Sequence, residues 1–217
     1  MSEAAAAVQT DTHAGHHEEL SFLYKYILPV DHKMIAMQYM FTGLIMAVIG
    51  GYFSYVFRMQ LAFPGESIPL YGIVGPGEYN MMVTNHGTIM IFWVAMPVLI
   101  AAFGNYLIPL MCGCDDMVFP RLNRLSYQIF LVSALVLILS FFVKGGGFGG
   151  AWTAYPPLSS VPEFSLTDWG ASLWILAVAL EFVSFLLGGI NFCLLYTLRA
   201  HETRHDLVCR LLLEKKR

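Results

Sequence analysis

Four long apolar runs, almost free of charge, constrain the fold of this chain more than any other feature. They cover about residues 34–57, 81–111, 125–143 and 171–198. A helix needs about 20 apolar residues to cross a hydrocarbon core about 30 Å thick. Because a bilayer offers no hydrogen bonds to the backbone, such runs cross it as helices. The sequence therefore predicts an all-α protein, a polytopic membrane bundle with four transmembrane helices.

Composition and charge agree with this fold class. The chain is 57% hydrophobic and 12% charged, whereas ordinary soluble domains carry about 25% charged residues. With the N-terminus inside, ten Lys and Arg residues fall on the inner side, and only Arg58 and Lys144 fall on the outer side. This asymmetry predicts an N-in, C-in topology. The net charge of −3 says nothing useful about nucleic acid, but the sequence has no basic stripe, so no nucleic acid is expected and the lipid membrane is the expected partner.

The two ends of the chain differ from its middle. Residues 1–30 are polar and without pattern, which predicts a disordered tail that lacks the apolar segment of a cleavable signal peptide. Residues 31–200 hold the four apolar runs and form the predicted membrane portion. Residues 201–217 are charged and predict a separate tail.

His86 is a polar side chain inside the second run, and intramembrane polar groups are functional by default. An imidazole there can ligate a haem iron or another metal, form a buried hydrogen bond, or carry a proton. Gly87 leaves room for a flat macrocycle, and Arg58, Trp152 and Tyr155 stand at the same outer level. This set suits a haem and its propionates. For the two aromatic residues, an ordinary interfacial belt explains the pattern equally well.

Neutral hydrogen-bonding side chains gather near the inner ends of the runs. Neutral amides and hydroxyls hold a chain of water without trapping a proton, and a solvated carboxylate at the mouth can collect protons. The alternative is that each polar group simply joins two helices. Taken together, the set predicts a proton path from the inner side, and its residues are Tyr39, Asn105, Asn123, Ser184 and Asn191, with Asp116 in the inner loop.

Glu181 places a carboxyl group in the middle of the fourth run. An ionised carboxylate without a partner is very costly in an apolar medium. Two interpretations stay open from the sequence, a proton relay and a hydrogen bond to a neighbouring helix.

Several of these residues stand in longer motifs that resemble subunit I of the haem-copper terminal oxidases. The motifs are D-H-K at 31–33, F-G-N at 103–105, D-M at 116–117, F-P-R-L-N at 119–123, A-W-T-A-Y-P-P-L at 151–158 and L-G-G-I-N-F at 187–192. The resemblance covers roughly residues 31–200 and is closer to the A-type oxidases than to the nitric oxide reductases. It implies that the chain corresponds to the N-terminal four helices of a twelve-helix fold.

The resemblance also implies roles for individual residues. His86 matches the axial ligand of the family's low-spin haem, of a or b type, and Arg58 and Trp152 match residues beside that haem. Asp116 matches the residue that opens the family's D proton pathway, which is lined by asparagines that match Asn105, Asn123 and Asn191.

The family activity that the resemblance implies is electron transfer from cytochrome c through the low-spin haem. In the full enzyme this transfer is coupled to reduction of O₂ to water and to proton pumping. The expected partners are oxidase subunits II and III, with cytochrome c donating through subunit II. The expected location is a bacterial inner membrane.

The sequence also departs from the family pattern. The second axial histidine, the copper ligands, the high-spin haem histidine and the glutamate at the top of the D pathway have no match. Copper is therefore expected only in the full-length family enzyme. Phe185 replaces one of two paired serines, and Gln60 stands where the family often has an acid.

The family motif breaks off after Ala200, which favours a truncated or frameshifted gene over a split subunit whose other helices form a second chain. We therefore expect this chain alone to be incomplete and inactive. The alternative function is a non-catalytic membrane assembly module, or an inactive truncated product.

Overall fold

The structure is a computed structural model that describes residues 27–114, 116–160 and 168–214. Its regular elements within these ranges are all helical. They are α1 (His32–Ala62), α2 (Pro76–Thr88), η2 (Ile89–Ala95), η3 (Pro97–Ala102), α3 (Phe103–Cys112), α4 (Pro120–Ser140) and α5 (Asp168–Glu214).

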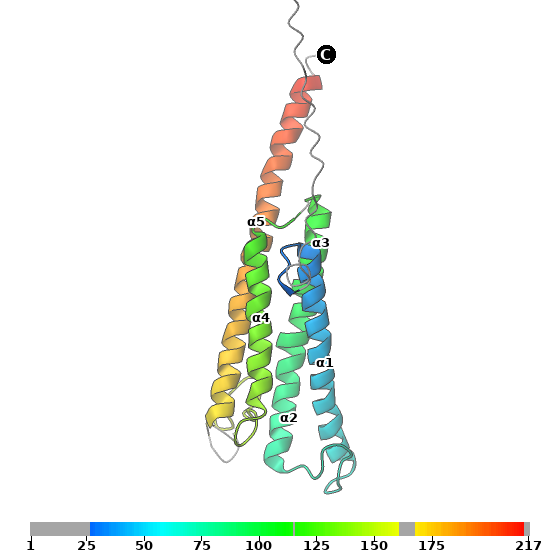
Figure 1. Cartoon of the computed structure of the whole chain (residues 1–217), viewed down its shortest axis with the longest axis vertical. Helices are drawn as coiled ribbons and strands as arrows, with labels where there is room; N and C mark the ends of the chain where they lie inside the picture. The colour runs from blue at the N-terminus through cyan, green and yellow to red at the C-terminus, as the bar shows by residue number, and fades with distance from the viewer. Residues whose placement is uncertain (1–26, 115, 161–167, 215–217) are drawn as a thin grey trace, which may run out of the picture.

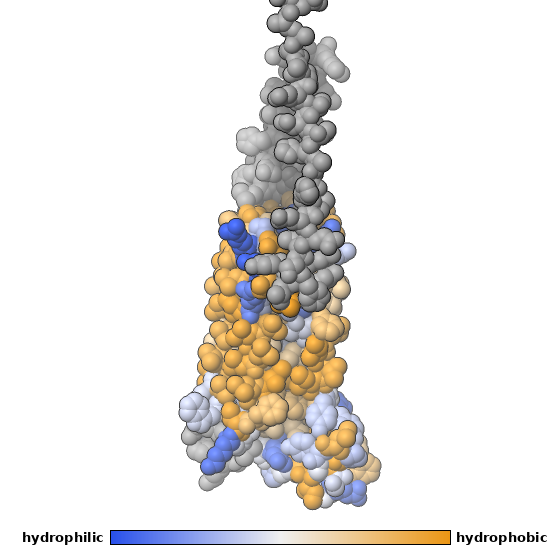
Figure 2. Space-filling view, in the orientation of Figure 1, coloured by the Kyte–Doolittle hydropathy of each residue, from blue (hydrophilic) through white to orange (hydrophobic). Residues whose placement is uncertain are grey.

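Four stretches of helix in this part of the chain are long and apolar enough to cross a membrane. They are His32–Ala62, Pro76–Cys112, Pro120–Ser140 and Trp169–Leu195. The second stretch joins α2, η2, η3 and α3 end to end; α1 packs against it, and α4 packs against α5 (Figure 1). An apolar surface covers the middle of the bundle, and polar groups gather toward its ends (Figure 2). The predicted all-α membrane bundle with four spans is confirmed.

Successive spans run in opposite directions, so their loops gather at two ends (Figure 1). The start of α1 and the loop residues 113–114 and 116–119 lie at one end, here called the Asp116 end. The loops at residues 63–75 and 141–160 lie at the other, the Arg58 end. The Asp116 end corresponds to the predicted inner side of the membrane.

The first three spans begin earlier than the apolar pattern predicts, because residues that suit the start of a helix precede each apolar run. The second begins at Pro76 rather than residue 81, and the Glu78 carboxylate accepts a hydrogen bond from the Gly75 N–H at 2.9 Å. The first begins after Asp31, whose side chain accepts from the Lys33 N–H at 3.3 Å. The third begins with Pro120, a residue that suits the first helical position.

The second span is widened around its proline. Pro97 has no N–H to donate, and its ring crowds the preceding turn. The chain responds with the π-helical stretches η2 and η3, and the Met96 N–H reaches back to the Ile91 carbonyl. The sequence predicts a kink near residues 95–97, whereas the structure spreads the distortion over residues 89–102. Such π turns inside α-helices are frequent at functional sites.

Glycines let α1 approach this widened span closely. A Cβ on Gly43 would stand 2.7 Å from Val98 Cγ2, and one on Gly50 would stand 3.1 Å from Ile89 Cγ2. Small residues at helix contacts are the usual means of close packing inside membranes. The positions of Gly43 and Gly50 therefore fix the distance between α1 and the second span.

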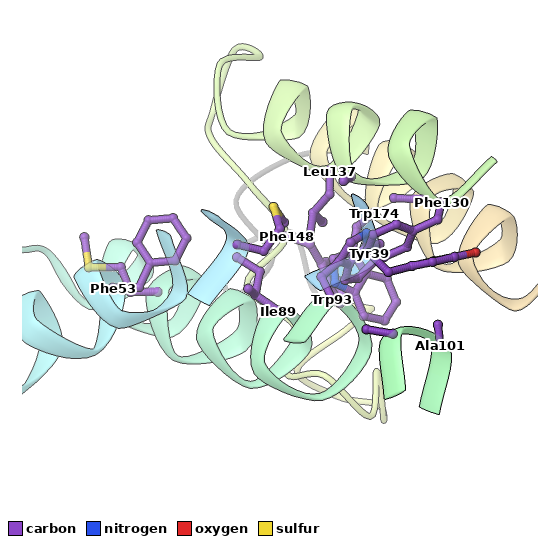
Figure 3. Packing of buried hydrophobic residues seen from close by; sticks show 14 of the residues in the cluster. Tyr39, Phe53, Ile89, Trp93, Ala101, Phe130, Leu137, Phe148 and Trp174 are labelled. Carbon is purple, nitrogen blue, oxygen red and sulfur yellow. The ribbon is translucent and has the colours of Figure 1, made fainter. Parts of the chain in front are cut away.

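A hydrogen-bonded relay ties three spans together in the core. The indole N–H of Trp93 donates to Ser133 Oγ at 3.1 Å, and Ser133 Oγ donates to the Ala177 carbonyl at 3.0 Å. Trp93 is fully buried and belongs to the same hydrophobic cluster as Tyr39 and Phe130 (Figure 3). The relay orients the second span, α4 and α5 relative to one another.

Ser133→Ala should destabilise the bundle, because it leaves the Trp93 N–H without its acceptor and the Ala177 carbonyl without this donor. The expected loss in the free energy of unfolding is about 0.6–1.7 kcal/mol, the range measured for hydrogen bonds between membrane helices. Ser140→Ala is the matched control, since this equally buried hydroxyl donates only to the Leu137 carbonyl of its own helix at 2.6 Å. Unfolding of the purified chain in detergent measures both, and equal losses would contradict the relay.

Candidate functional site

His86 presents an imidazole that is oriented by the neighbouring helix. Its Nδ1 lies 2.9 Å from the carbonyl oxygen of Gly50 on α1. Because a carbonyl only accepts hydrogen bonds, Nδ1 carries the proton in this contact, and the lone pair is on Nε2. A hydrogen bond from the second ring nitrogen to a carbonyl is the usual support of a metal-bound histidine. His86 lies about three turns into the span, deeper than the sequence predicts, because α2 begins at Pro76.

The surroundings of His86 are aromatic and lined by glycine. The Phe57 ring stands edge-on to the imidazole, with 5.5 Å between the ring centroids. A Cβ on Gly87 would lie 3.4 Å from Trp152 Cδ1, so Trp152 covers the residue next to His86. On α1, a Cβ on Gly51 would have no other atom within 4 Å. The α1 backbone is therefore open at Gly51, the residue that follows the partner of His86.

The loop that carries Trp152 is anchored to α2 by two side chains that the sequence pattern does not single out. The Ala151 N–H donates to Thr84 Oγ1 at 3.0 Å, and the Asn85 amide donates to the Phe148 carbonyl at 2.9 Å. The only sequence signal for this anchor is two adjacent polar residues directly before an intramembrane histidine.

The other two residues predicted for the haem site, Arg58 and Tyr155, are exposed at this end of the bundle. Arg58 is exposed and lies about two turns beyond Gly50 on α1. Its Nε donates a hydrogen bond to Ser54 Oγ at 3.3 Å. The Tyr155 side chain is 74% exposed. The structure thus brings Trp152 against the backbone next to His86, and places Arg58 and Tyr155 at the same end of the bundle.

At the opposite end, Asp116 pairs with a buried histidine. His32 Nδ1 lies 3.1 Å from Asp116 Oδ1, which also accepts from the Met117 N–H at 2.7 Å. His32 is 1% exposed, and its Nε2 has no hydrogen-bond partner within the described chain. His32 is not among the residues that the sequence pattern predicts for a site. Its signal is the D-H-K motif just before the first span.

Asn191 holds the loop that bears Asp116 against α5. Its Oδ1 accepts from the Phe119 N–H at 2.9 Å, and its Nδ2 donates to the Phe119 carbonyl at 3.0 Å. This reciprocal pair uses one oxygen and one N–H of the amide. Asn191 therefore fixes the position of the loop relative to α5.

Hydroxyl groups from three helices meet further inside. The Tyr39 hydroxyl lies 3.0 Å from Ser126 Oγ and 3.3 Å from Ser184 Oγ. Ser184 Oγ also donates to the Ser126 carbonyl at 2.7 Å, and Ser126 Oγ donates to the Asn123 carbonyl at 2.7 Å. Ser126 is absent from the predicted set, although it links the two predicted hydroxyls.

A small cavity adjoins these hydroxyls. It has a volume of about 50 Å³, and its lining includes Tyr39, Asn105, Ser126 and Ser184. A water molecule needs roughly 10–15 Å³ measured in this way, so the cavity has room for a few. Asn105 donates from Nδ2 to the Ala101 carbonyl at 2.8 Å, whereas its Oδ1 has no hydrogen-bond partner among the described residues. The cavity is therefore polar enough to hold water.

Two further predicted residues have buried side chains that form no hydrogen bond with the described chain. Both side-chain atoms of the Asn123 amide lack a partner, as do both carboxyl oxygens of Glu181. Asn123 is 1% exposed and Glu181 is 0% exposed. Buried polar groups normally have partners, so each of these unpaired groups needs an explanation.

Comparison with known proteins identifies the family of this chain. The sequence profile described as "Cytochrome C and Quinol oxidase polypeptide I" matches residues 34–208. The "Alternative cytochrome c oxidase subunit 1" of Bradyrhizobium diazoefficiens is 37% identical over 191 residues, which cover 88% of this chain and 31% of that protein. The "Cytochrome c oxidase subunit 1" of Synechocystis sp. is 45% identical over 163 residues, which cover 75% of this chain and 27% of the relative.

A third relative is named differently. The "Heme-copper oxidase subunit I+III" of Aeropyrum pernix is 40% identical over 175 residues, which cover 80% of this chain and 20% of that protein. The chain thus spans about a third or less of the length of these curated relatives. With a profile that matches most of its length and relatives that share more than a third of the aligned residues, the chain belongs to the haem-copper oxidase subunit I family.

Proposed function

We propose that this chain binds a low-spin haem near the Arg58 end and admits protons from the Asp116 end, as part of an oxidase that receives electrons from cytochrome c, reduces O₂ to water and pumps protons. The observation that carries the proposal is the hydrogen bond from His86 Nδ1 to the Gly50 carbonyl. Family membership supports the role as an oxidase subunit.

The residues around His86 fit a haem. The tautomer that Gly50 selects offers the Nε2 lone pair to an iron, and Gly51 leaves open space on α1, whereas Trp152 covers Gly87. When bound, such a haem accepts and donates one electron at a time. In this proposal His86 would be the metal ligand, the indole N–H of Trp152 would serve a propionate, and the Arg58 guanidinium would lie beside the haem. Tyr155 belongs to the same end as an interfacial aromatic residue.

The residues of the Asp116 end fit a path for protons. Asp116 collects protons at the loop, and His32 holds its carboxylate in place. Asn191 anchors the loop, while Asn123 and Asn105 offer unpaired polar atoms to water. Tyr39 and Ser184 then line the cavity. Because the haem and the proton path lie at opposite ends, electrons and protons would meet inside the membrane, and each charge moved across it stores about 2.3 kcal/mol per 100 mV.

Further parts of the enzyme belong to the same proposal. The second axial ligand, the copper and the high-spin haem would be held by residues outside this sequence. The proposed partners are subunits II and III, with cytochrome c as the donor through subunit II. The proposed location is a bacterial inner membrane, with residues 31–200 as the membrane portion.

His86→Ala should abolish the low-spin haem band, because it removes the proposed iron ligand. The measurement is a reduced-minus-oxidised visible spectrum of this chain, purified from its native membrane with the subunits that accompany it. His32→Ala is the matched control, since it removes a histidine at the opposite end and should leave the band unchanged. A folded, colourless wild-type bundle would contradict the proposal and favour the assembly module.

Gly51→Leu should lower haem content without unfolding the bundle. The added side chain meets no other atom of the chain within 4 Å of its Cβ, and in this proposal it occupies space that the haem needs. Haem per protein and the unfolding temperature, measured on the same sample, separate the two effects. Normal haem content in this variant would show that the ring system lies elsewhere.

Asp116→Asn should slow proton uptake from the Asp116 side by about a hundredfold, the lower end of what a positioned proton-transfer group contributes. The rate is measured in vesicles that contain the assembled oxidase. Asp31→Asn is the matched control, because asparagine caps a helix as well as aspartate does. Asp116→Glu should restore uptake. Equal rates in Asp116→Asn and wild type would remove Asp116 from the path.

A further inference from the structure

Glu181 of α5 is a carboxyl group enclosed by the bundle itself. Its side chain is 0% exposed in this chain alone, so the four spans bury it without help from any other subunit. Neither carboxyl oxygen has a hydrogen-bond partner among the described residues. An acid that served only to join two helices would donate or accept a bond between them. Its burial without a partner therefore points to a different role.

Glu181 lies on the same face of α5 as two residues that line the small cavity next to Tyr39 and Ser126. Residues 181, 184 and 188 lie on one face of α5, since side chains three and four positions apart share a helix face. Ser184 and Gly188 both line the cavity. Glu181 stands about 4.5 Å further along the helix axis, away from the Asp116 end. It also lies within electrostatic range of the Tyr39 hydroxyl, which is bonded to Ser184.

On its other side, Glu181 faces a layer in which the polar groups already have partners. Four residues toward the Arg58 end, the Ala177 carbonyl accepts from Ser133, which in turn accepts from Trp93. No Lys or Arg occurs in the four apolar runs, so no cation within them pairs with the carboxylate. The proposed series of hydroxyl and amide side chains that begins at Asp116 therefore ends at Ser184, within one helical turn of Glu181.

We propose that Glu181 is the inner proton acceptor of this path. A hydronium ion in the cavity transfers its proton to the carboxylate, which leaves water and a neutral carboxylic acid, and the reverse step returns the proton. The inference rests on the proposed proton path and adds its end point. It assigns Ser184 as the carrier between the cavity and the acid.

Infrared spectroscopy of the full chain in lipid vesicles tests the proposal, because a protonated carboxylic acid has its own carbonyl stretch. The band assigned to Glu181 should be present in wild type, absent in Glu181→Gln and retained in the control Glu78→Gln, which alters a carboxyl group in the first turn of α2. After transfer to D₂O, the O–H of this acid becomes O–D with release of HDO. The rate of the resulting band shift reports access from the path.

Ser184→Ala should slow this exchange by about tenfold, which corresponds to about 1.4 kcal/mol in the barrier. Ser184→Thr keeps the hydroxyl and should keep the wild-type rate, and Ser140→Ala should leave it unchanged. Should Glu181→Gln fail to fold, Glu181→Asp retains an acid and should show a shifted band. A wild-type spectrum without a band for Glu181 would overturn the proposal, and so would equal exchange rates in wild type and Ser184→Ala.

The exchange measurement needs no haem, no electron donor and no O₂. A chain that fails to bind haem would contradict the proposed oxidase role but leave this test intact. Conversely, a chain with a normal haem band and no effect of Ser184→Ala on exchange would remove only the assignment of Glu181.

Discussion

Polar groups inside hydrocarbon must find partners within the protein, and the packing of this bundle depends on that requirement. Trp93, Ser133 and the Ala177 carbonyl satisfy one another across three spans. Thr42 and Tyr127 do so across two, with 3.0 Å between their hydroxyl oxygens. Apolar contacts alone give little direction to helices in lipid, because lipid tails are as apolar as leucine. These few hydrogen bonds therefore select one arrangement from many of similar packing energy.

The same requirement divides the bundle into two kinds of polar region. In the layer around Trp93, donors and acceptors are matched. Toward the Asp116 end, Asn105, Asn123, His32 and Glu181 each keep at least one buried atom without a partner. Unpaired atoms of this kind are costly unless water or a proton satisfies them. Gln60 and Asn85 carry such atoms toward the Arg58 end, so the matched layer around Trp93 separates two regions in which buried polar atoms lack a partner in the described chain.

The sequence predicts the number of spans and the chemistry of both ends, because apolar length and polar residue type are local properties. It does not predict the pairs Asp116–His32 and Asn191–Phe119, since each joins segments more than 70 residues apart. It also places the start of the second span five residues late, because a Pro-Gly-Glu first turn is polar although it is helical. The partner of His86 is a backbone carbonyl, which no side-chain pattern can reveal.

The π-helical stretch between residues 89 and 102 has a consequence for how the second span tolerates changes in length. A π turn closes its hydrogen bond over one residue more than an α turn does. Deletion of one residue there can convert a wide turn into a regular one, while the helices on either side keep their own bonding. A change in length within the π-helical stretch can thus leave the backbone hydrogen bonds around His86 and around Asn105 unchanged.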